Sequence, residues 1–159
     1  MFKVHLSITL LALLTLKPAW CQRAAVVKFD ELQKILDTDA NEIQVINFWA
    51  TWCAPCVKEL PLLEKINEQG NENVKITLIS LDYADKVDKV NQFISRKNIK
   101  SKVLLLDDID YNSWIDKVDK RWTGAIPATL VINSKTKQRK FLEKELKEGE
   151  LEKLIAELQ

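Results

Sequence analysis

Two cysteines, Cys53 and Cys56, stand where an apolar strand pattern gives way to a helical one. Residues 42–49 are rich in β-branched and aromatic side chains, and the run is too short for a helix of ordinary length, so it predicts a strand. A helical pattern follows from Val57 onward. Cys53 is therefore expected at the beginning of a helix, where unpaired backbone N–H groups and a partial positive charge stabilise a thiolate over a thiol.

This placement makes Cys53 the candidate nucleophile for disulfide exchange. Cys56 lies one turn further along the helix, so it can form a disulfide with Cys53 and release a bound partner. A structural zinc site is the first alternative. It needs about four Cys or His ligands, and the remaining ones, His5 and Cys21, lie near the start of the chain. A purely structural disulfide is the second alternative, but it would close a very short loop, where the gain in stability is smallest. The pattern favours redox chemistry that needs neither a metal nor a cofactor.

The N-terminal segment, 1–21, has the pattern of a secretory signal. Lys3 supplies the positive start, residues 6–16 form an apolar stretch, and small residues precede the expected cleavage after Cys21. The stretch is shorter than the roughly 20 residues that cross a bilayer, although an uncleaved membrane anchor stays open as an alternative. Lipid attachment at Cys21 is disfavoured, because Trp20 stands where a bacterial lipoprotein signal has a small residue. We therefore expect an exported protein, periplasmic or otherwise extracytoplasmic.

The rest of the chain retains only Cys53 and Cys56 as cysteines. Disulfides persist outside the cytosol, yet a secreted protein that used them as staples would carry more of them, so a single pair fits exchange better. The length suffices for one domain with a full core, which we place at 25–159. The charges nearly balance, with a formal net charge of +1 for the whole chain, and nothing in the sequence suggests that it binds nucleic acid.

Strand and helix patterns alternate along this domain. Strands are expected at 26–28, 43–50, 74–81, 103–106, 128–132 and 138–142, and helices at 30–36, 53–69, 87–94, a stretch with Tyr111, Trp114, Ile115, Val118 and Trp122 on one face, and 151–158. Such alternation predicts an α/β fold with a mainly parallel sheet covered on both faces. The short link between the last two strands predicts an antiparallel hairpin at one edge. In such sheets, sites form where strand carboxyl ends meet helix N-termini, and Cys53 satisfies that rule.

Two segments carry a resemblance to a known family. The run 45–61, which contains WCAPCVKELP, resembles the WCxPCxxExP signature of the TlpA/ResA-like exported thiol-disulfide oxidoreductases, which have a thioredoxin-like fold. The run 123–129 is similar to the part of that fold that holds a cis-proline. The expected helix and strand at about 86–107 resemble the central insertion that separates TlpA-like proteins from plain thioredoxin. The resemblance extends over nearly all of residues 25–158.

The resemblance implies a role for each matching residue. Cys53 is implied to be the exposed attacking thiol and Cys56 the resolving thiol. Pro127 is implied to be cis and to lie beside the cysteine pair, which leaves the backbone of Ile126 free to pair with a substrate strand, with Trp52 also at the substrate-binding surface. The alternative for Pro127 is an ordinary trans proline that opens a strand.

Glu59 lies three residues after Cys56, on the same side of the expected helix. A carboxylate there would raise the pKa of a nearby cysteine, and a partly buried carboxyl group can relay protons during exchange. The alternative is a surface glutamate in the first turns of a helix, where the helix dipole favours it. Plain thioredoxin carries a buried Asp in the preceding strand. This chain has Asn47, which cannot titrate, so the acid–base role falls to Glu59.

These observations lead to one favoured function and three alternatives. The favoured one is a monomeric oxidoreductase that reduces disulfides in extracytoplasmic proteins with electrons from a membrane donor, as the resemblance implies. An oxidase or isomerase on the same fold is the first alternative, since potentials of CxxC proteins span about −270 to −120 mV. A cytochrome c maturation thioredoxin is the second alternative. It is weakened because the members of the resembled family with that role carry an acidic residue just after the cis-proline, whereas this chain has Ala128. The third is a non-catalytic module that binds peptides by strand addition beside Pro127.

Overall fold

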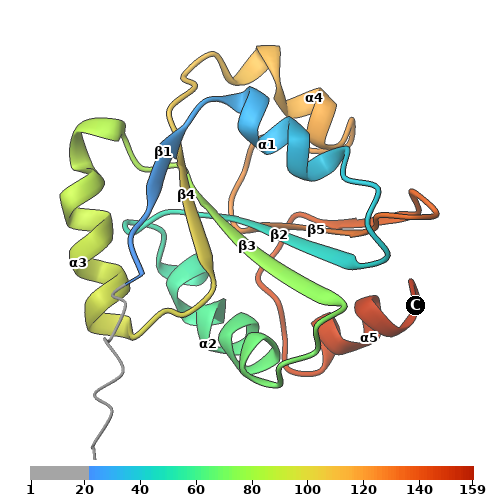
Figure 1. Ribbon diagram of the computed structural model, residues 1–159. Coiled ribbons are helices and arrows are strands. Elements are labelled where there is room, and N and C mark those ends of the chain that lie inside the picture. Colours follow the sequence, from blue (N-terminus) through green and yellow to red (C-terminus); the bar gives the residue numbers. More distant parts are fainter. Residues whose placement is uncertain (1–21) are drawn as a thin grey trace, which may run out of the picture.

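One mixed sheet organises the part of the chain that the computed structural model describes, residues 22–159. Its six strands follow the order β1-β4-β3-β2-β5-β6, and helices cover both faces (Figure 1). The predicted α/β architecture is confirmed, including the mainly parallel sheet with an antiparallel pair at one edge. The expected signal segment, with His5 and Cys21, lies outside the described residues.

All the expected strands are present, with bounds that differ from expectation by a residue or two. They are β1 (Ala25–Val27), β2 (Ile43–Trp49), β3 (Val74–Ser80), β4 (Lys102–Leu106), β5 (Ala128–Asn133) and β6 (Arg139–Leu142). The helices are α1 (Phe29–Leu36), α2 (Ala54–Glu68), α3 (Val87–Lys97), α4 (Ile115–Val118) and α5 (Glu150–Ala156), with 3-10 turns at Ala84–Lys86 and Tyr111–Ser113. No helix among these residues is both long enough and apolar enough to cross a membrane.

Strand β2 lies at the centre of the sheet and leads directly to the cysteine pair. It pairs in parallel with β3, from Ile43 opposite Val74 to Trp49 opposite Ser80. On its other edge it pairs antiparallel with β5. Every residue of β2 is buried, including the polar Gln44 and Asn47, as is usual for a strand that is covered on both faces.

The alternating side chains of β2 enter two separate hydrophobic cores. Val45 and Trp49 pack toward α2, α3 and α5, whereas Ile46 and Phe48 pack toward α1 and the aromatic residues around α4. Figure 1 shows α1 and α4 together on one face and α2 and α5 on the other. Since strand side chains alternate with a period of two, Asn47 points to the same face as Val45 and Trp49, the face that α2 covers.

The expected additional helix and strand form one helix–strand unit, whose strand is inside the sheet. Helix α3 follows β3, and β4 then lies between β1 and β3, parallel to both. The expectation of an additional helix and strand at about 86–107 is confirmed in position.

The single helix expected over Tyr111 to Trp122 is wrong. The structure has a 3-10 turn followed by the four-residue helix α4, which ends at Val118 because Asp119 is extended, with φ −158° and ψ 129°. The Asp119 carboxylate accepts hydrogen bonds from the backbone and side chain of Arg121, which stabilises a turn in place of another helical turn. Trp122 lies beyond the helix and packs on Phe48, with ring centroids 4.4 Å apart. Trp114, Val118 and Trp122 were spaced as on one face of a helix because they pack in the same hydrophobic core, and residues can reach that core from a turn as well as from a helix.

Candidate redox site

Cys53 and Cys56 form a disulfide at the N-terminus of α2, with Cα atoms 5.3 Å apart. Cys53 is the N-cap residue of the helix, and Pro55 lies in the first turn, where its missing N–H leaves no unpaired donor. The backbone N–H of Cys56 donates a hydrogen bond of 3.3 Å to Cys53 Sγ. In the reduced protein this donor and the helix dipole would favour a thiolate at Cys53.

The two sulfur-bearing residues differ in access to solvent. Cys53 is 6% exposed and Cys56 is completely buried. Cys53 is therefore less open than the exposed thiol that the resemblance implied, but it is the member of the pair that a partner can reach. Its neighbour Trp52 is 63% exposed and stands out from the loop between β2 and α2.

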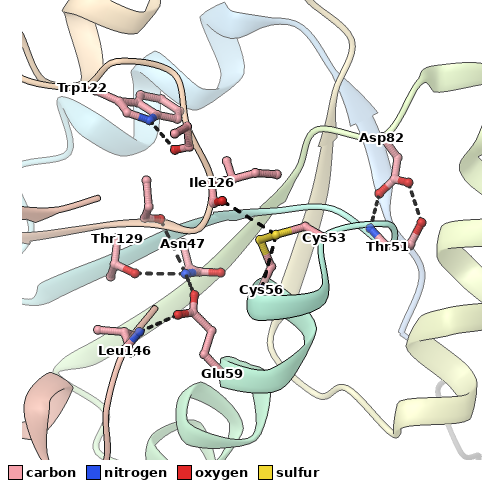
Figure 2. The surroundings of a disulfide bond; sticks show 12 residues. Asn47, Thr51, Cys53, Cys56, Glu59, Asp82, Trp122, Ile126, Thr129 and Leu146 are labelled. Atoms are coloured by element: carbon pink, nitrogen blue, oxygen red, sulfur yellow. Dashed lines mark hydrogen bonds between the residues drawn. A yellow bond between two sulfur atoms is a disulfide. The ribbon is translucent and has the colours of Figure 1, made fainter. Parts of the chain in front are cut away.

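A second loop reaches the cysteine pair from the start of β5. The peptide bond between Ile126 and Pro127 is cis, as the resemblance implied. The carbonyl oxygen of Ile126 lies 3.8 Å from Cys53 Sγ (Figure 2). A disulfide sulfur carries no hydrogen, so this is a contact and not a hydrogen bond. Trp122 holds the same loop through a hydrogen bond of 2.8 Å from Nε1 to the oxygen of Ala125.

Glu59 is buried beneath the cysteines, at 1% exposure, so the surface alternative for this residue is wrong. Its Oε1 accepts a hydrogen bond of 2.7 Å from Asn47 Nδ2, and its Oε2 accepts one of 2.7 Å from the backbone N–H of Leu146. Asn47 Nδ2 also donates to Thr129 Oγ1 at 2.9 Å. Figure 2 shows the Glu59 carboxylate between the first turns of α2 and the segment that carries Leu146.

Burial raises the pKa of Glu59 above its ordinary value, and the negative charges of Glu145 and Glu150 act in the same direction. The hydrogen bonds from Leu146 and Asn47 oppose this shift, because they stabilise the ionised form. The net result is a pKa of Glu59 above that of an ordinary glutamate.

Two further carboxylates hold the loops around the cysteines, and the sequence reasoning missed both. Asp82 follows β3 and accepts hydrogen bonds from Thr51. Glu143 follows β6 and accepts hydrogen bonds from Thr123 and Ala125. A signal for Asp82 was present, since a polar residue directly after a buried strand stands at the edge of the sheet where such sites form. No comparable signal marks Glu143.

Comparison with known families decides which group of proteins shares this arrangement. A family model described as Redoxin matches residues 27–155. The chain belongs to the Redoxin family. This Redoxin chain is also 30% identical over 114 residues to a thiol-disulfide oxidoreductase ResA of Bacillus cereus, a match that spans 72% of the chain and 60% of that relative. It is 31% identical over 76 residues to the thioredoxin-like protein YneN of Bacillus subtilis, over 47% of the chain and 44% of the relative.

A solved structure shares the fold of this chain. The thioredoxin-related protein of Neisseria meningitidis serogroup B superposes with a TM-score of 0.64 at 23% identity, over 74% of this chain and 84% of that one. The resemblance of this Redoxin chain to the TlpA/ResA-like thioredoxin-fold proteins is therefore confirmed. The chain spans less than two thirds of the length of the curated relatives ResA and YneN.

Proposed function

We propose that the protein is an exported thiol-disulfide oxidoreductase that reduces disulfides of extracytoplasmic proteins. The Cys53 thiolate attacks a sulfur of the substrate disulfide, which forms a mixed disulfide and releases one substrate thiolate. Cys56 then attacks Cys53, which forms the disulfide of the site and releases the second substrate thiolate. Two electrons pass from the cysteine pair to the substrate, and both released thiolates take up protons.

The single observation that carries this proposal is the hydrogen bond from the Cys56 backbone N–H to Cys53 Sγ at the N-terminus of α2. A donor at this position stabilises negative charge on one sulfur of the pair and not on the other. Cys53 therefore serves better than Cys56 both as a nucleophile and as a leaving group. The difference in access, 6% against 0%, gives the same assignment of roles.

Glu59 supports the resolving step in this proposal. The buried Cys56 thiol must lose its proton before it can attack Cys53, and a base must lie on the same side of α2. Glu59 is one helical turn beyond Cys56, and burial raises its pKa, which makes its carboxylate a stronger base than that of an ordinary glutamate. Asn47 cannot titrate, but it orients the carboxylate through the 2.7 Å hydrogen bond.

The substrate is proposed to bind as an extended chain beside Ile126 and Pro127. The backbone of Ile126 lies next to Cys53, so a strand that pairs with it would bring a substrate cysteine to the reactive sulfur. Trp52, which directly precedes Cys53 in the chain, offers an exposed aromatic surface to apolar substrate residues.

Export, the direction of electron flow and the donor also belong to this proposal. The signal pattern at 1–21 supports export, and the resemblance to ResA-like proteins supports net reduction with a membrane thiol donor. The substrates are protein disulfides, and the protein acts as a monomer in this scheme.

The direct test is a pair of cysteine variants in an insulin reduction assay with dithiothreitol as the electron source. Cys53→Ser is expected to lose activity in this assay, and Cys56→Ser, reduced and then freed of dithiothreitol, is expected to accumulate a mixed disulfide with insulin. Full activity in Cys53→Ser, with no trapped intermediate in Cys56→Ser, would reverse the assigned roles. A redox titration of the pair against glutathione decides direction, since a potential near the oxidising end, about −120 mV, would indicate an oxidase.

A further inference from the structure

Two loops from different parts of the chain meet at Cys53. One joins β2 to α2 and contains Thr51, and the other precedes β5 and contains Thr123 to Ile126. Neither loop has regular secondary structure, yet the reaction proposed above needs them at a fixed separation. The contact of 3.8 Å between Cys53 Sγ and the Ile126 oxygen is where they come together.

The first loop is tied to the end of β3 by the buried carboxylate of Asp82, which is 4% exposed. Its Oδ2 accepts a hydrogen bond of 2.9 Å from the Thr51 N–H, and its Oδ1 accepts one of 2.6 Å from Thr51 Oγ1. Ser80 Oγ donates to Oδ2 at 2.8 Å and so fixes the carboxylate itself. Figure 2 shows Asp82 and Thr51 facing each other on the side of Cys53 away from Ile126. We call these contacts the Asp82–Thr51 bridge.

The second loop is tied to the end of β6 by the carboxylate of Glu143. Its Oε1 accepts a hydrogen bond of 3.0 Å from the Ala125 N–H, and Thr123 Oγ1 donates to the same oxygen. The Thr123 N–H lies 3.2 Å from each carboxylate oxygen. The Glu143 side chain therefore accepts hydrogen bonds from two backbone N–H groups and one hydroxyl group of the residues just before Ile126. We call these contacts the Glu143–Thr123 bridge.

Resting on the function proposed above, we propose that Asp82 and Glu143 are positioning residues that hold the two sides of the redox site independently. The Asp82–Thr51 bridge fixes the backbone two residues before Cys53, and so fixes its sulfur against the Cys56 N–H. The Glu143–Thr123 bridge fixes the backbone next to Ile126, and so holds the edge that receives the substrate chain. Neither carboxylate touches the reacting sulfur atoms.

The two bridges therefore have different kinetic consequences. Loss of the Asp82–Thr51 bridge changes the reactivity of Cys53 toward every electrophile, whether iodoacetamide, a small disulfide or a protein. Loss of the Glu143–Thr123 bridge leaves the sulfur in place and affects only substrates that bind along Ile126. Loss of a residue with a merely structural role would lower the fraction of folded protein. It would therefore slow the reactions with small reagents and with protein substrates by the same factor.

The first arm of the test compares Thr51→Val with Thr51→Ser. Valine keeps the shape and the backbone N–H but removes the hydroxyl donor, and serine keeps that donor. Iodoacetamide alkylation of Cys53 in the reduced protein, followed against pH, is expected to slow about threefold to tenfold in the valine variant, the range for one lost hydrogen bond. Serine is expected to restore the rate. Asp82→Asn tests the other partner, with Asp107→Asn as a control, because Asp107 forms an ion pair with Lys28 and belongs to neither bridge.

The second arm compares Glu143→Ala with Glu157→Ala, a carboxylate that pairs with Lys140 through a contact of 2.9 Å and lies outside both bridges. Single-turnover oxidation of the reduced protein is measured with insulin and with oxidised glutathione. Glu143→Ala is expected to raise the half-saturating insulin concentration about threefold to tenfold, while its rate with glutathione and the behaviour of Glu157→Ala stay at the wild-type level.

The outcomes separate the two proposals. Wild-type protein that reacts with neither disulfide overturns the proposed function and this inference with it. Active wild-type protein with equal alkylation rates in Thr51→Val and Thr51→Ser overturns the role of the Asp82–Thr51 bridge. Equal losses with insulin and glutathione in Glu143→Ala, in step with a lower melting temperature, overturn the role of the Glu143–Thr123 bridge.

Discussion

Asn47 Nδ2 donates a hydrogen bond of 2.7 Å to Glu59 Oε1, in a position where both residues are buried. The same nitrogen donates to Thr129 Oγ1, so one amide joins α2, β2 and β5 beneath the cysteine pair. An amide at residue 47 has a clear electrostatic advantage over a carboxylate. The amide donates a hydrogen bond to Glu59 and carries no charge, so the site contains one buried acid, whereas a carboxylate at residue 47 would make two.

Asn47→Asp is expected to make stability strongly dependent on pH. Two carboxyl groups in contact cannot both ionise, so the pair must keep a shared proton that the unfolded chain releases. The free energy of unfolding should therefore fall as the pH rises, by on the order of 3 kcal/mol at pH 8 relative to wild type, as for an uncompensated buried charge. Urea unfolding of the oxidised protein between about pH 5 and pH 8 measures this. Asn91→Asp, where the Oδ1 already accepts a hydrogen bond from the Ala24 N–H, is the matched control and should show little change.

Glu59→Gln is expected to remove a pH dependence that wild-type protein has. Burial raises the folded-state pKa of Glu59 above the ordinary value of 4.5, so the folded state binds its proton more tightly than the unfolded state does. The stability from this group is present below the unfolded pKa and is lost as the pH rises through the raised folded pKa. The difference in unfolding free energy between wild type and Glu59→Gln should therefore shrink over that interval and stay constant above it. A difference that grows with pH would show that the folded-state pKa is lowered.

Glu59→Gln is also expected to slow the resolving step while leaving the first attack intact. Without a base near Cys56, the mixed disulfide should persist, and its decay should slow by about a hundredfold, the lower end of the range for lost general base catalysis. Quenched-flow trapping of the intermediate with a fluorescent disulfide peptide measures both steps. Glu64→Gln is the matched control on the same helix, because Glu64 accepts hydrogen bonds from Lys100 and Ser101 away from the cysteines. Equal slowing in both variants would indicate a general effect on α2.

The strands and the cysteine site were predictable because their signals are local. The apolar-rich runs of β2 and β3 and the switch to a helical pattern after Cys56 lie within short stretches of sequence. The burial of Glu59 is different, because it depends on the N–H of Leu146, which is 87 residues away in the chain. The sequence allowed both a surface and a functional interpretation of Glu59, and the tertiary contact decides against the surface.

The hydrogen-bond partners of the positioning carboxylates could not be identified from the sequence for the same reason, although the place of Asp82 after a buried strand was a signal. Asp82 and Thr51 are 31 residues apart, and Glu143 and Thr123 are 20 apart, so neither pair follows a helical or hairpin spacing. The helix expected across Trp114 and Trp122 was wrong because aromatic residues can reach one core from a turn as well as from a helix. The ring centroids of Trp114 and Trp122 lie 5.6 Å apart, although the chain between them leaves the helix at Val118.

Trp114→Ala is expected to destabilise the fold without altering the chemistry of the cysteines. Trp114 is completely buried, its ring lies 5.8 Å from that of Phe29 and 5.6 Å from that of Trp122, and its Nε1 donates to the Asp108 oxygen at 3.1 Å. Truncation of a buried tryptophan costs about 3–5 kcal/mol. Urea unfolding should show this loss, and the alkylation rate of Cys53 in the folded protein should stay at the wild-type level. An unchanged midpoint would mean that this aromatic core contributes little.

Trp52→Ala is expected to have the opposite profile, because this tryptophan is 63% exposed and the structure gives it no ring partner among the described residues. The unfolding free energy should change by less than about 0.5 kcal/mol, as for an ordinary surface position. The half-saturating insulin concentration should rise, because apolar contact with the substrate chain is lost, while the rate with oxidised glutathione stays the same. Trp52→Phe, which keeps an aromatic surface, should recover most of the insulin reaction. Wild-type kinetics with insulin in Trp52→Ala would place the substrate contact elsewhere on the rim of the site.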